Sequence, residues 1–205
     1  CSDVTERRLA EQQQREILRR EQEARLAAEQ ARVRLAFLAD ASAVLSTSLD
    51  PDETLHSLGE LCVPSLADTC FIDLIGDDGL LHDQVGLGST EVKLHDAKLL
   101  RKRRKELGTQ APTATGHLEA MEGKGLLYQS IDDAQLAAAA ADADHLALFR
   151  RFDARSTIMA PLVARGRVVG VITLVRTGDG VPFDEDDLAM VEELAARAAL
   201  ATDNG

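Results

Sequence analysis

Cysteine is scarce in this sequence, which holds only Cys1, Cys62 and Cys70. The number is odd and no two of them stand at C-x-x-C spacing, which argues against a disulfide framework, a zinc knuckle and an iron–sulfur site. We therefore expect a cytoplasmic protein. Cys62 and Cys70 are expected to be small residues of the core.

Long apolar runs and a positive net charge are also missing. No run approaches the roughly 20 apolar residues that cross a bilayer, and no signal peptide opens the chain, so no membrane association is expected. The net charge of −12 argues against binding to a nucleic-acid backbone. No Ser/His/Asp or Cys/His set has a recognisable local signature, so no catalytic residue and no enzymatic activity are expected.

A polar arm opens the chain, and its composition changes near Val33. Residues 5–34 are almost entirely Glu, Gln, Arg, Ala and Leu, without Gly or Pro. Pairs such as Glu16/Arg20 and Glu21/Arg25 have the i,i+4 spacing of a helix. The sequence therefore predicts a helical arm over residues 1–33 and one globular domain over residues 34–205.

An apolar seam with alternating steps of four and three follows this helix into the globular part. Gln14 and Glu21 weaken its beginning. We expect a parallel homodimer through this helix, joined by the C-terminal helix; the alternative is a solvated single helix held by its charge pairs. The seam residues are Ile17, Ala24, Ala28, Ala31, Leu35, Leu38 and Leu45.

The globular part begins with a helix start at Asp50-Pro51-Asp52-Glu53, in which Asp50 is the cap and Pro51 the first helical residue. Its inner face is Leu55, Leu58 and Cys62. The elements expected next are a strand over 70–75, a turn over 76–79, a returning strand over 80–85, a helix over 91–107, a strand over 126–131, and helical segments over 137–141 and 144–152.

The last third of the chain carries the clearest pattern. Two β-branched runs are joined through Ala164-Arg165-Gly166-Arg167, which predicts a hairpin, and both runs are apolar at successive residues, so both sheet faces must be covered. Asp184 then caps a helix with three acidic residues in its first turn. Its predicted buried stripe is Leu188, Val191, Ala195 and Ala198.

With this hairpin, this helix and the order of elements before them, residues 34–204 resemble a GAF domain. The resemblance implies an α/β (α+β) fold with an antiparallel sheet of about six strands between helices. The first and last helices would cover one face, and a ligand-sized cavity would lie on the other.

The ends of the chain resemble the joints of a larger bacterial receptor. Residues 2–8 are similar to the Asp-x-Thr exit of a PAS domain into a signalling helix, and residues 195–204 are similar to the exit helix of a GAF domain. The resemblance implies a sensory module that binds a small molecule and relays the signal through dimeric helices. The output would be a histidine kinase or a sporulation-type serine phosphatase. The alternative is a ligand-free dimerisation and relay spacer between the PAS domain and the output enzyme.

The expected ligand pocket follows from the alternation of the first strand. Burying Cys70 and Ile72 against the helix layer turns Phe71 and Asp73 toward the cavity. Tyr128, His145, Phe149 and Ser156 are expected to join them. A buried Asp on an apolar strand needs a partner, so Asp73 is the residue expected to meet a polar group of the ligand.

No cofactor or metal can be assigned. Phe183-Asp184-Glu185 resembles a fragment of the cyclic-nucleotide signature of some GAF domains, but the accompanying Asn-Lys pair is missing. Bilin-binding relatives use a cysteine of the pocket-lining segment, whereas Cys62 and Cys70 are placed on a helix and a strand. A lone His145 is more often solvated than a haem or metal ligand. A GAF-type reductase is disfavoured because only two cysteines lie inside the domain.

The basic run over residues 101–105 is unexpected in so acidic a chain. It falls toward the end of a predicted helix, where cations complement the negative end of the dipole, so a solvated helix face is expected. The functional alternative is a docking site for an acidic partner or a neighbouring domain.

Overall fold

The computed structural model describes residues 2–45, 50–107 and 115–202. Cys1 and the end of the expected exit segment, Asp203 and Asn204, lie outside the described residues. The chain divides into two units, residues 1–40 and residues 41–205. None of the described helices is both long and apolar enough to cross a bilayer.

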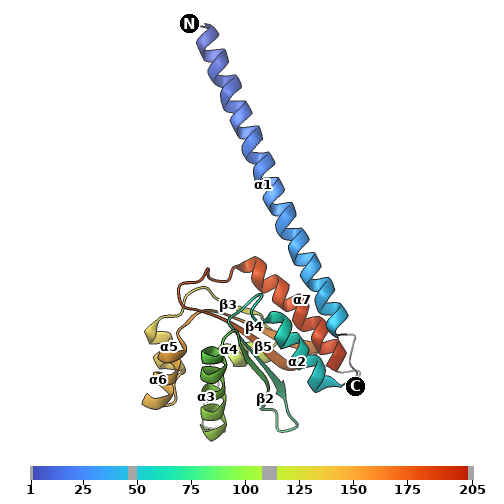
Figure 1. Ribbon diagram of the computed structural model, residues 1–205, viewed down its shortest axis with the longest axis vertical. Coiled ribbons are helices and arrows are strands. Elements are labelled where there is room, and N and C mark those ends of the chain that lie inside the picture. Colours follow the sequence, from blue (N-terminus) through green and yellow to red (C-terminus); the bar gives the residue numbers. More distant parts are fainter. Residues whose placement is uncertain (1, 46–49, 108–114, 203–205) are drawn as a thin grey trace. The chain divides into compact units, whose positions relative to one another are not determined.

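The polar arm forms one continuous helix, α1 (Ser2–Leu45), drawn in blue in Figure 1. The predicted pair Glu16/Arg20 is present, with Arg20 Nε 3.0 Å from a Glu16 carboxylate oxygen. Two apolar seam residues, Ile17 and Leu35, are 56% and 67% exposed in the single chain. An isolated polar helix does not bury such a stripe by itself.

The globular unit begins at α2 (Pro51–Cys62), capped as predicted. The Asp50 carboxylate accepts a hydrogen bond of 2.9 Å from the Asp52 backbone N–H, and Pro51 occupies the first turn, where a missing N–H costs nothing. Leu55, Leu58 and Cys62 form the fully buried face that the sequence predicts.

An antiparallel sheet forms the centre of this unit, which confirms the predicted fold class. Its strands in the described residues are β1 (Thr69–Ile75), β2 (Leu81–Gly88), β3 (Leu126–Tyr128), β4 (Ala154–Ala164) and β5 (Arg167–Thr177). Their order is β2-β1-β5-β4-β3, so the sheet has five of the roughly six strands expected. The strand predicted over 126–131 is shorter than expected and ends at Tyr128.

The β4–β5 hairpin has the predicted turn. Ala164 pairs with Arg167, and Arg165 and Gly166 have φ of 48° and 77°. Two consecutive positive φ values define the two-residue turn that matches the twist of a hairpin. Both strands are buried along most of their length because helices cover both faces of the sheet.

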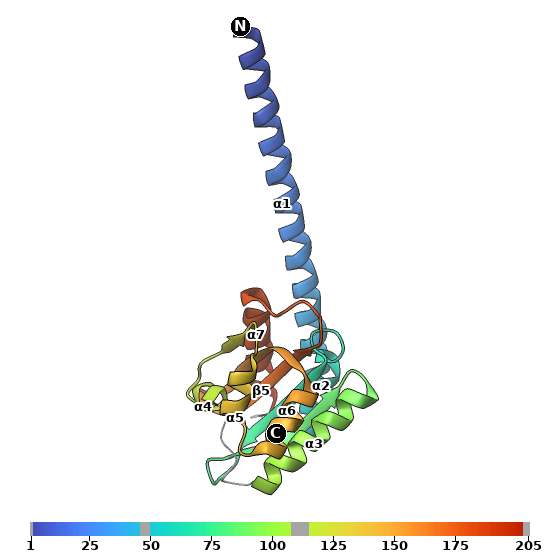
Figure 2. The same ribbon diagram turned by 90° about the vertical axis from the view of Figure 1, so that its left-hand side faces the viewer.

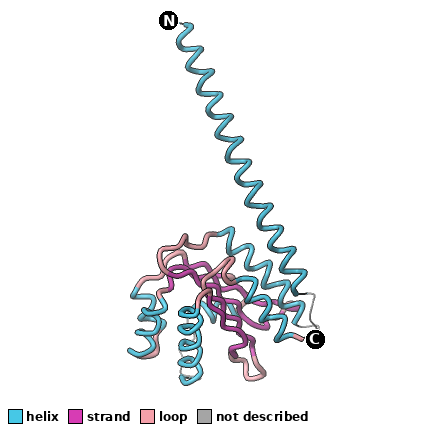
Figure 3. The backbone as a smooth tube through the Cα atoms, viewed as in Figure 1, coloured by secondary structure: helices cyan, strands magenta, loops and turns pink. Residues whose placement is uncertain are grey.

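Two helix layers enclose the sheet (Figures 1 and 3). One face carries α2 and α7 (Glu185–Thr202), whose cap is the predicted one: Asp184 accepts a hydrogen bond of 2.9 Å from Asp187 N–H. The other face carries α3 (Glu91–Leu107), α4 (Thr115–Met121) and α6 (Ala143–Phe152), with α5 (Asp133–Ala139) beside α6. Figure 2 shows α3 and α6 side by side on this face.

Two glycines of β2 allow α3 to approach the sheet closely. A Cβ at Gly88 would lie 2.3 Å from the Leu94 backbone nitrogen, and one at Gly86 would lie 2.6 Å from Arg101 Cδ. The first contact is with backbone, which has no rotamer by which to yield. Because Gly86 and Gly88 have no side chains, α3 lies close to the sheet, and this short distance fixes the position of the basic run.

We expect Gly88→Ala to destabilise the protein by about 2 kcal/mol, because α3 must move away from the sheet to admit the methyl group. Gly180→Ala is the matched control, since its Cβ would meet nothing nearer than 3.7 Å. Chemical denaturation followed by circular dichroism measures both variants. Equal midpoints for the two variants would contradict the close approach of α3.

Candidate functional site

Asp73 lies on β1 in the middle of the sheet, opposite Val171 of β5, and is 1% exposed. The alternation of β1 separates the two faces. Cys70 turns toward α2, where a hydrogen bond with Cys62 and burial raise the pKa of the Cys70 thiol. Asp73 turns toward α3. A carboxylate so deeply buried requires an ionic or hydrogen-bonding partner.

Arg104 of α3 supplies that partner. Its two terminal nitrogens lie 2.6 and 3.1 Å from the two carboxylate oxygens of Asp73, the parallel fork that arginine forms with carboxylates. The expectation of a solvated basic run is therefore right for Lys102, which is 74% exposed, and wrong for Arg104, which turns inward.

His117 of α4 lies beside this ion pair. Burial lowers the pKa of His117, and the positive charge of Arg104 lowers it further, while Asp73 acts in the opposite direction. The imidazole is therefore neutral at neutral pH. The start of α4 rests on the sheet, since a Cβ at Gly116 would lie 2.9 Å from both Met159 Sδ and the Tyr128 hydroxyl.

Thr173 of β5 lies on the same face, paired with Phe71 of β1 on one side and Met159 of β4 on the other. It is 5% exposed, and its hydroxyl has no hydrogen-bond partner within the part of the chain that the structure describes. Buried hydroxyls are normally paired. We call Asp73, Arg104, His117 and Thr173 the Asp73 cluster.

Phe71 and Tyr128, predicted to line the pocket, do lie on this face of the sheet. Phe71 contacts Phe152 of α6, with ring centroids 6.1 Å apart. Lys93 of α3 donates a 3.2 Å hydrogen bond to the Phe152 carbonyl. Burial is the main reason why the pKa of Tyr128 is raised.

His145 and Phe149, also predicted for the pocket, are neighbours on α6, with ring centroids 4.3 Å apart. His145 is buried; its Nδ1 accepts a 3.2 Å hydrogen bond from Ala141 N–H, and burial lowers its pKa. It follows Asp142, which pairs with Arg103 of α3. Asp142 also accepts a 2.8 Å hydrogen bond from the His145 N–H, so His145 lies beside the ionic contact between α3 and α6, and Phe149 packs on its ring.

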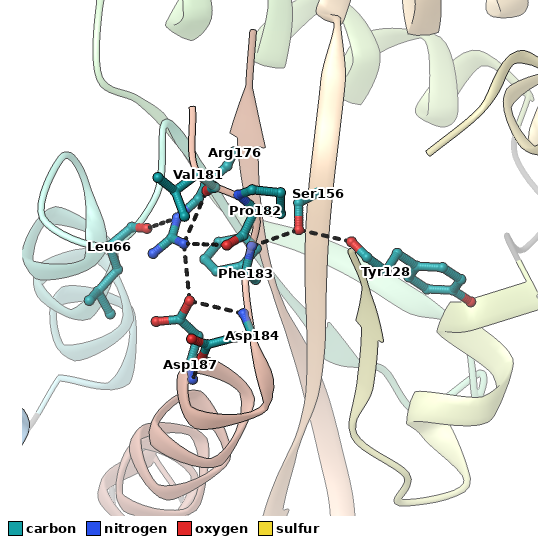
Figure 4. A network of polar contacts seen from close by, with 9 residues as sticks. All are labelled: Leu66, Tyr128, Ser156, Arg176, Val181, Pro182, Phe183, Asp184 and Asp187. Atoms are coloured by element: carbon teal, nitrogen blue, oxygen red, sulfur yellow. Dashed lines mark hydrogen bonds and ion pairs between the residues drawn. The ribbon is translucent and has the colours of Figure 1, made fainter. Parts of the chain in front are cut away.

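Ser156 lies on the opposite face, toward α7, so its predicted place in the pocket is wrong. Its hydroxyl donates to the Tyr128 carbonyl at 2.9 Å and accepts from Phe183 N–H at 3.0 Å (Figure 4). The physical reason is the alternation of β4: Ser156 pairs with Arg176 and lies two residues before Ile158, which pairs with Leu174, so these side chains share the face of α2 and α7.

Arg176 of β5 holds the start of α7 on that face. Its guanidinium donates to the Leu66 and Pro182 carbonyls and to the Asp187 carboxylate at 3.0–3.2 Å, and it lies 4.0 Å above the Phe183 ring (Figure 4). The loop after α2, the loop after β5 and the first turn of α7 thus meet at one side chain.

Two hollows are found elsewhere on the surface, one at the β1–β2 hairpin and one beside Arg176. Neither is lined by a member of the Asp73 cluster. Within residues 2–45, 50–107 and 115–202, no group of three His, Cys, Asp or Glu side chains is arranged to hold a metal ion. The site is therefore defined by its buried polar groups.

Comparison with known protein families shows to which family the chain belongs. The GAF domain model matches residues 21–202, most of the chain. The chain is a member of the GAF family. None of the curated proteins compared with this GAF domain matches it.

Solved structures share the fold at low identity. The GAF domain of a phosphoenolpyruvate-protein phosphotransferase from Coxiella burnetii is 16% identical, with a TM-score of 0.60, over 81% of this chain and 90% of that one. Free methionine-R-sulfoxide reductase from Neisseria meningitidis is 18% identical, with a TM-score of 0.60, over 85% of this chain and 91% of that one. A GAF domain/HD domain protein from Geobacter sulfurreducens is 18% identical, with a TM-score of 0.54, over 78% of this chain and 95% of that one.

Three members of the Asp73 cluster were not singled out from the sequence as site residues. Arg104 is hidden in a run of five basic residues, and His117 and Thr173 have no spacing pattern of their own. The one available signal was Asp73 itself, because a buried carboxylate implies a cation nearby. That cation lies 31 residues away along the chain.

We expect Arg104→Met to destabilise the domain by about 3 kcal/mol, because it leaves the buried Asp73 charge without a partner. Asp73→Leu combined with Arg104→Met should recover most of this loss, since no charge is then buried. Lys102→Met on the exposed side of α3 is the control and should change stability by less than about 0.5 kcal/mol. Urea denaturation compares the three; an Arg104→Met protein as stable as the control would refute the ion pair.

We expect stability to fall as the pH drops below about 6.5, the ordinary pKa of histidine, and to be fully present above it. The unfolded chain takes up a proton at His117 that the folded chain resists, a linkage of at most about 1.4 kcal/mol per pH unit. Thermal unfolding of His117→Gln at pH 7.5 and 5.5 should show a smaller loss than the parent. The lowered pKa of His145 also reduces stability at low pH, so the His117→Gln variant still loses part of its stability between pH 7.5 and 5.5. His56→Gln, at an exposed site on α2, should retain the parent slope.

Proposed function

We propose that this GAF domain is a regulatory sensory module that binds a small molecule over the Asp73 cluster and relays its occupancy through α7 and α1. The observation that carries the proposal is the cluster itself: an ion pair with a buried carboxylate, and a buried hydroxyl that has no partner among the described residues.

A purely structural sheet has no need of these groups. Burying an ion pair is often neutral or unfavourable compared with apolar residues of similar volume, and an unpaired buried hydroxyl costs about 1–3 kcal/mol. A few polar groups gathered on an otherwise apolar face are the usual composition of a ligand site. A ligand that bonds to Thr173 would recover the lost hydrogen bond.

The relay is supported by the connection between the sheet and α7. Ser156 ties the carbonyl of edge strand β3 to Phe183, directly before α7, and Arg176 of β5 bonds to Asp187 in its first turn. A shift of β3 or β5 caused by a ligand on the other face would therefore move the start of α7. Such coupling is typically worth about 1–3 kcal/mol.

Two named relatives support the role of a module within a larger protein. The Coxiella burnetii structure is a domain taken from a phosphotransferase, and the Geobacter sulfurreducens protein combines GAF and HD domains. For this chain we propose a PAS domain as input and a histidine kinase or serine phosphatase as output. The proposed homodimer joins the exposed seam of α1, in which Ile17, Ala24, Ala28, Ala31 and Leu35 are all solvent-accessible.

A reductase activity like that of the Neisseria meningitidis relative is less well supported. Cys62 and Cys70 are fully buried between α2 and β1, on the side of the sheet away from the Asp73 cluster. The raised pKa of Cys70 keeps its thiol protonated, and only the thiolate is an effective nucleophile.

Native mass spectrometry of freshly purified protein tests the proposal. We expect a dimer that carries a small molecule, which denaturing conditions release because no covalent bond holds it. Ile17→Glu together with Leu35→Glu should yield monomers, because two charges are placed in the seam. Leu26→Glu is the control, since Leu26 is 66% exposed on the same helix but lies off the seam.

The outcomes separate the alternatives. A dimer with a clean polypeptide mass favours the relay spacer without a ligand. A monomer with a clean mass contradicts both functions.

A further inference from the structure

The Asp73 cluster also indicates what kind of molecule it accepts. We propose that the ligand is an uncharged planar molecule that presents a hydrogen-bond donor and an acceptor on one edge, as an amide, a lactam or a nucleobase does. This inference rests on the proposed function and names the chemical class of its ligand.

Charge balance among the described side chains favours an uncharged ligand. The carboxylate of Asp73 is already matched by the two-point contact with Arg104. An anion that drew Arg104 away would leave Asp73 charged, buried and unpaired, and an anion bound beside the pair would face the Asp73 charge. A cation would have to displace a bidentate guanidinium, the strongest kind of carboxylate partner.

Two other basic side chains among the described residues bear on this balance. His117 is neutral at neutral pH because burial lowers its pKa. Arg101, one turn before Arg104, lies over Gly86 on the edge strand β2. One strand, β1, separates that edge from Thr173 on β5, and Phe71 stands between Gly86 and Thr173 in the same row of the sheet.

The hydrogen-bonding pattern specifies a donor and an acceptor. An ionised carboxylate only accepts, and its two oxygens have about four lone-pair positions, of which Arg104 uses two. Asp73 can therefore accept a hydrogen bond from a donor group on the ligand. The Thr173 hydroxyl, which has no partner among the described residues, is able to donate to an acceptor.

The register places these two groups at a suitable separation. Asp73 pairs with Val171, so Thr173 is its diagonal neighbour on β5, at a typical Cα separation of about 7–8 Å. Two hydrogen bonds of about 2.9 Å and one N–C=O edge span such a gap. Phe71 and Met159 flank Thr173 on the neighbouring strands, so the side chains on either side of the hydroxyl are apolar.

The first test uses the protein without any ligand. Thr173→Val replaces an unpartnered hydroxyl by a methyl group of the same shape, so we expect an unchanged or higher melting temperature. Thr69→Val is the matched control, because the Thr69 hydroxyl on β1 is also fully buried and unpartnered among the described residues. A lower melting temperature for Thr173→Val alone would overturn the inference, since the hydroxyl would then already be in use.

The second test compares three probes that share one ring: benzamide, which is neutral, benzoate, an anion, and benzamidine, a cation at neutral pH. Ligand-observed NMR titration should detect binding of benzamide only. Thr173→Val should weaken benzamide binding about tenfold, whereas Thr69→Val should leave it unchanged.

Preferential binding of benzoate or benzamidine, or equal effects of the two threonine variants, would overturn the chemical class while leaving a ligand site in place. Binding of none of the probes would also overturn the class. Failure of the proposed function itself is seen separately, as a clean polypeptide mass in native mass spectrometry.

Discussion

The ion pair between Asp73 and Arg104 is the interaction on which the α3 side of the sheet in this GAF domain depends. A carboxylate that is 1% exposed in the middle of a sheet is tolerated only with a partner, and the partner comes from a helix that two glycines of β2 allow to lie close to the strands. Once α3 is fixed in this way, α6 is positioned through its polar contacts with α3, and α4 brings His117 to the same point.

The two faces of the sheet are built from different chemistry. The face under α2 and α7 is apolar and close-packed, with Cys70, Ile72 and Leu174 fully buried. The other face holds the Asp73 cluster and is bounded by helices whose mutual contacts are ionic, such as Arg151 with Asp96 and Arg103 with Asp142. Ionic contacts adapt to solvent and to charge more readily than a close-packed core, so the polar face is the one suited to respond to a ligand.

A single layer of strands separates the two faces, and side chains of opposite orientation alternate along each strand. Met159 and Thr173 lie on the face of the Asp73 cluster, whereas their neighbours Ile158 and Leu174 lie on the face covered by α2 and α7. At the end of the sheet, Ser156 and Arg176 tie β3, β4 and β5 to the first turn of α7. The strands are therefore the direct physical connection between the Asp73 cluster and the first turn of α7.

The amino-acid sequence alone determined the features that depend on neighbouring residues: the caps at Asp50 and Asp184, the two-residue turn at Arg165-Gly166, and the bounds of α3 at Glu91 and Leu107. These follow from interactions within a few positions of the chain. Only the tertiary structure decided that Arg104 turns inward and that Ser156 turns away from the face that holds the Asp73 cluster. Arg104 meets its partner 31 residues away and Ser156 meets Phe183 27 residues away, and contacts at such separations depend on strand register and helix height, which local pattern does not encode.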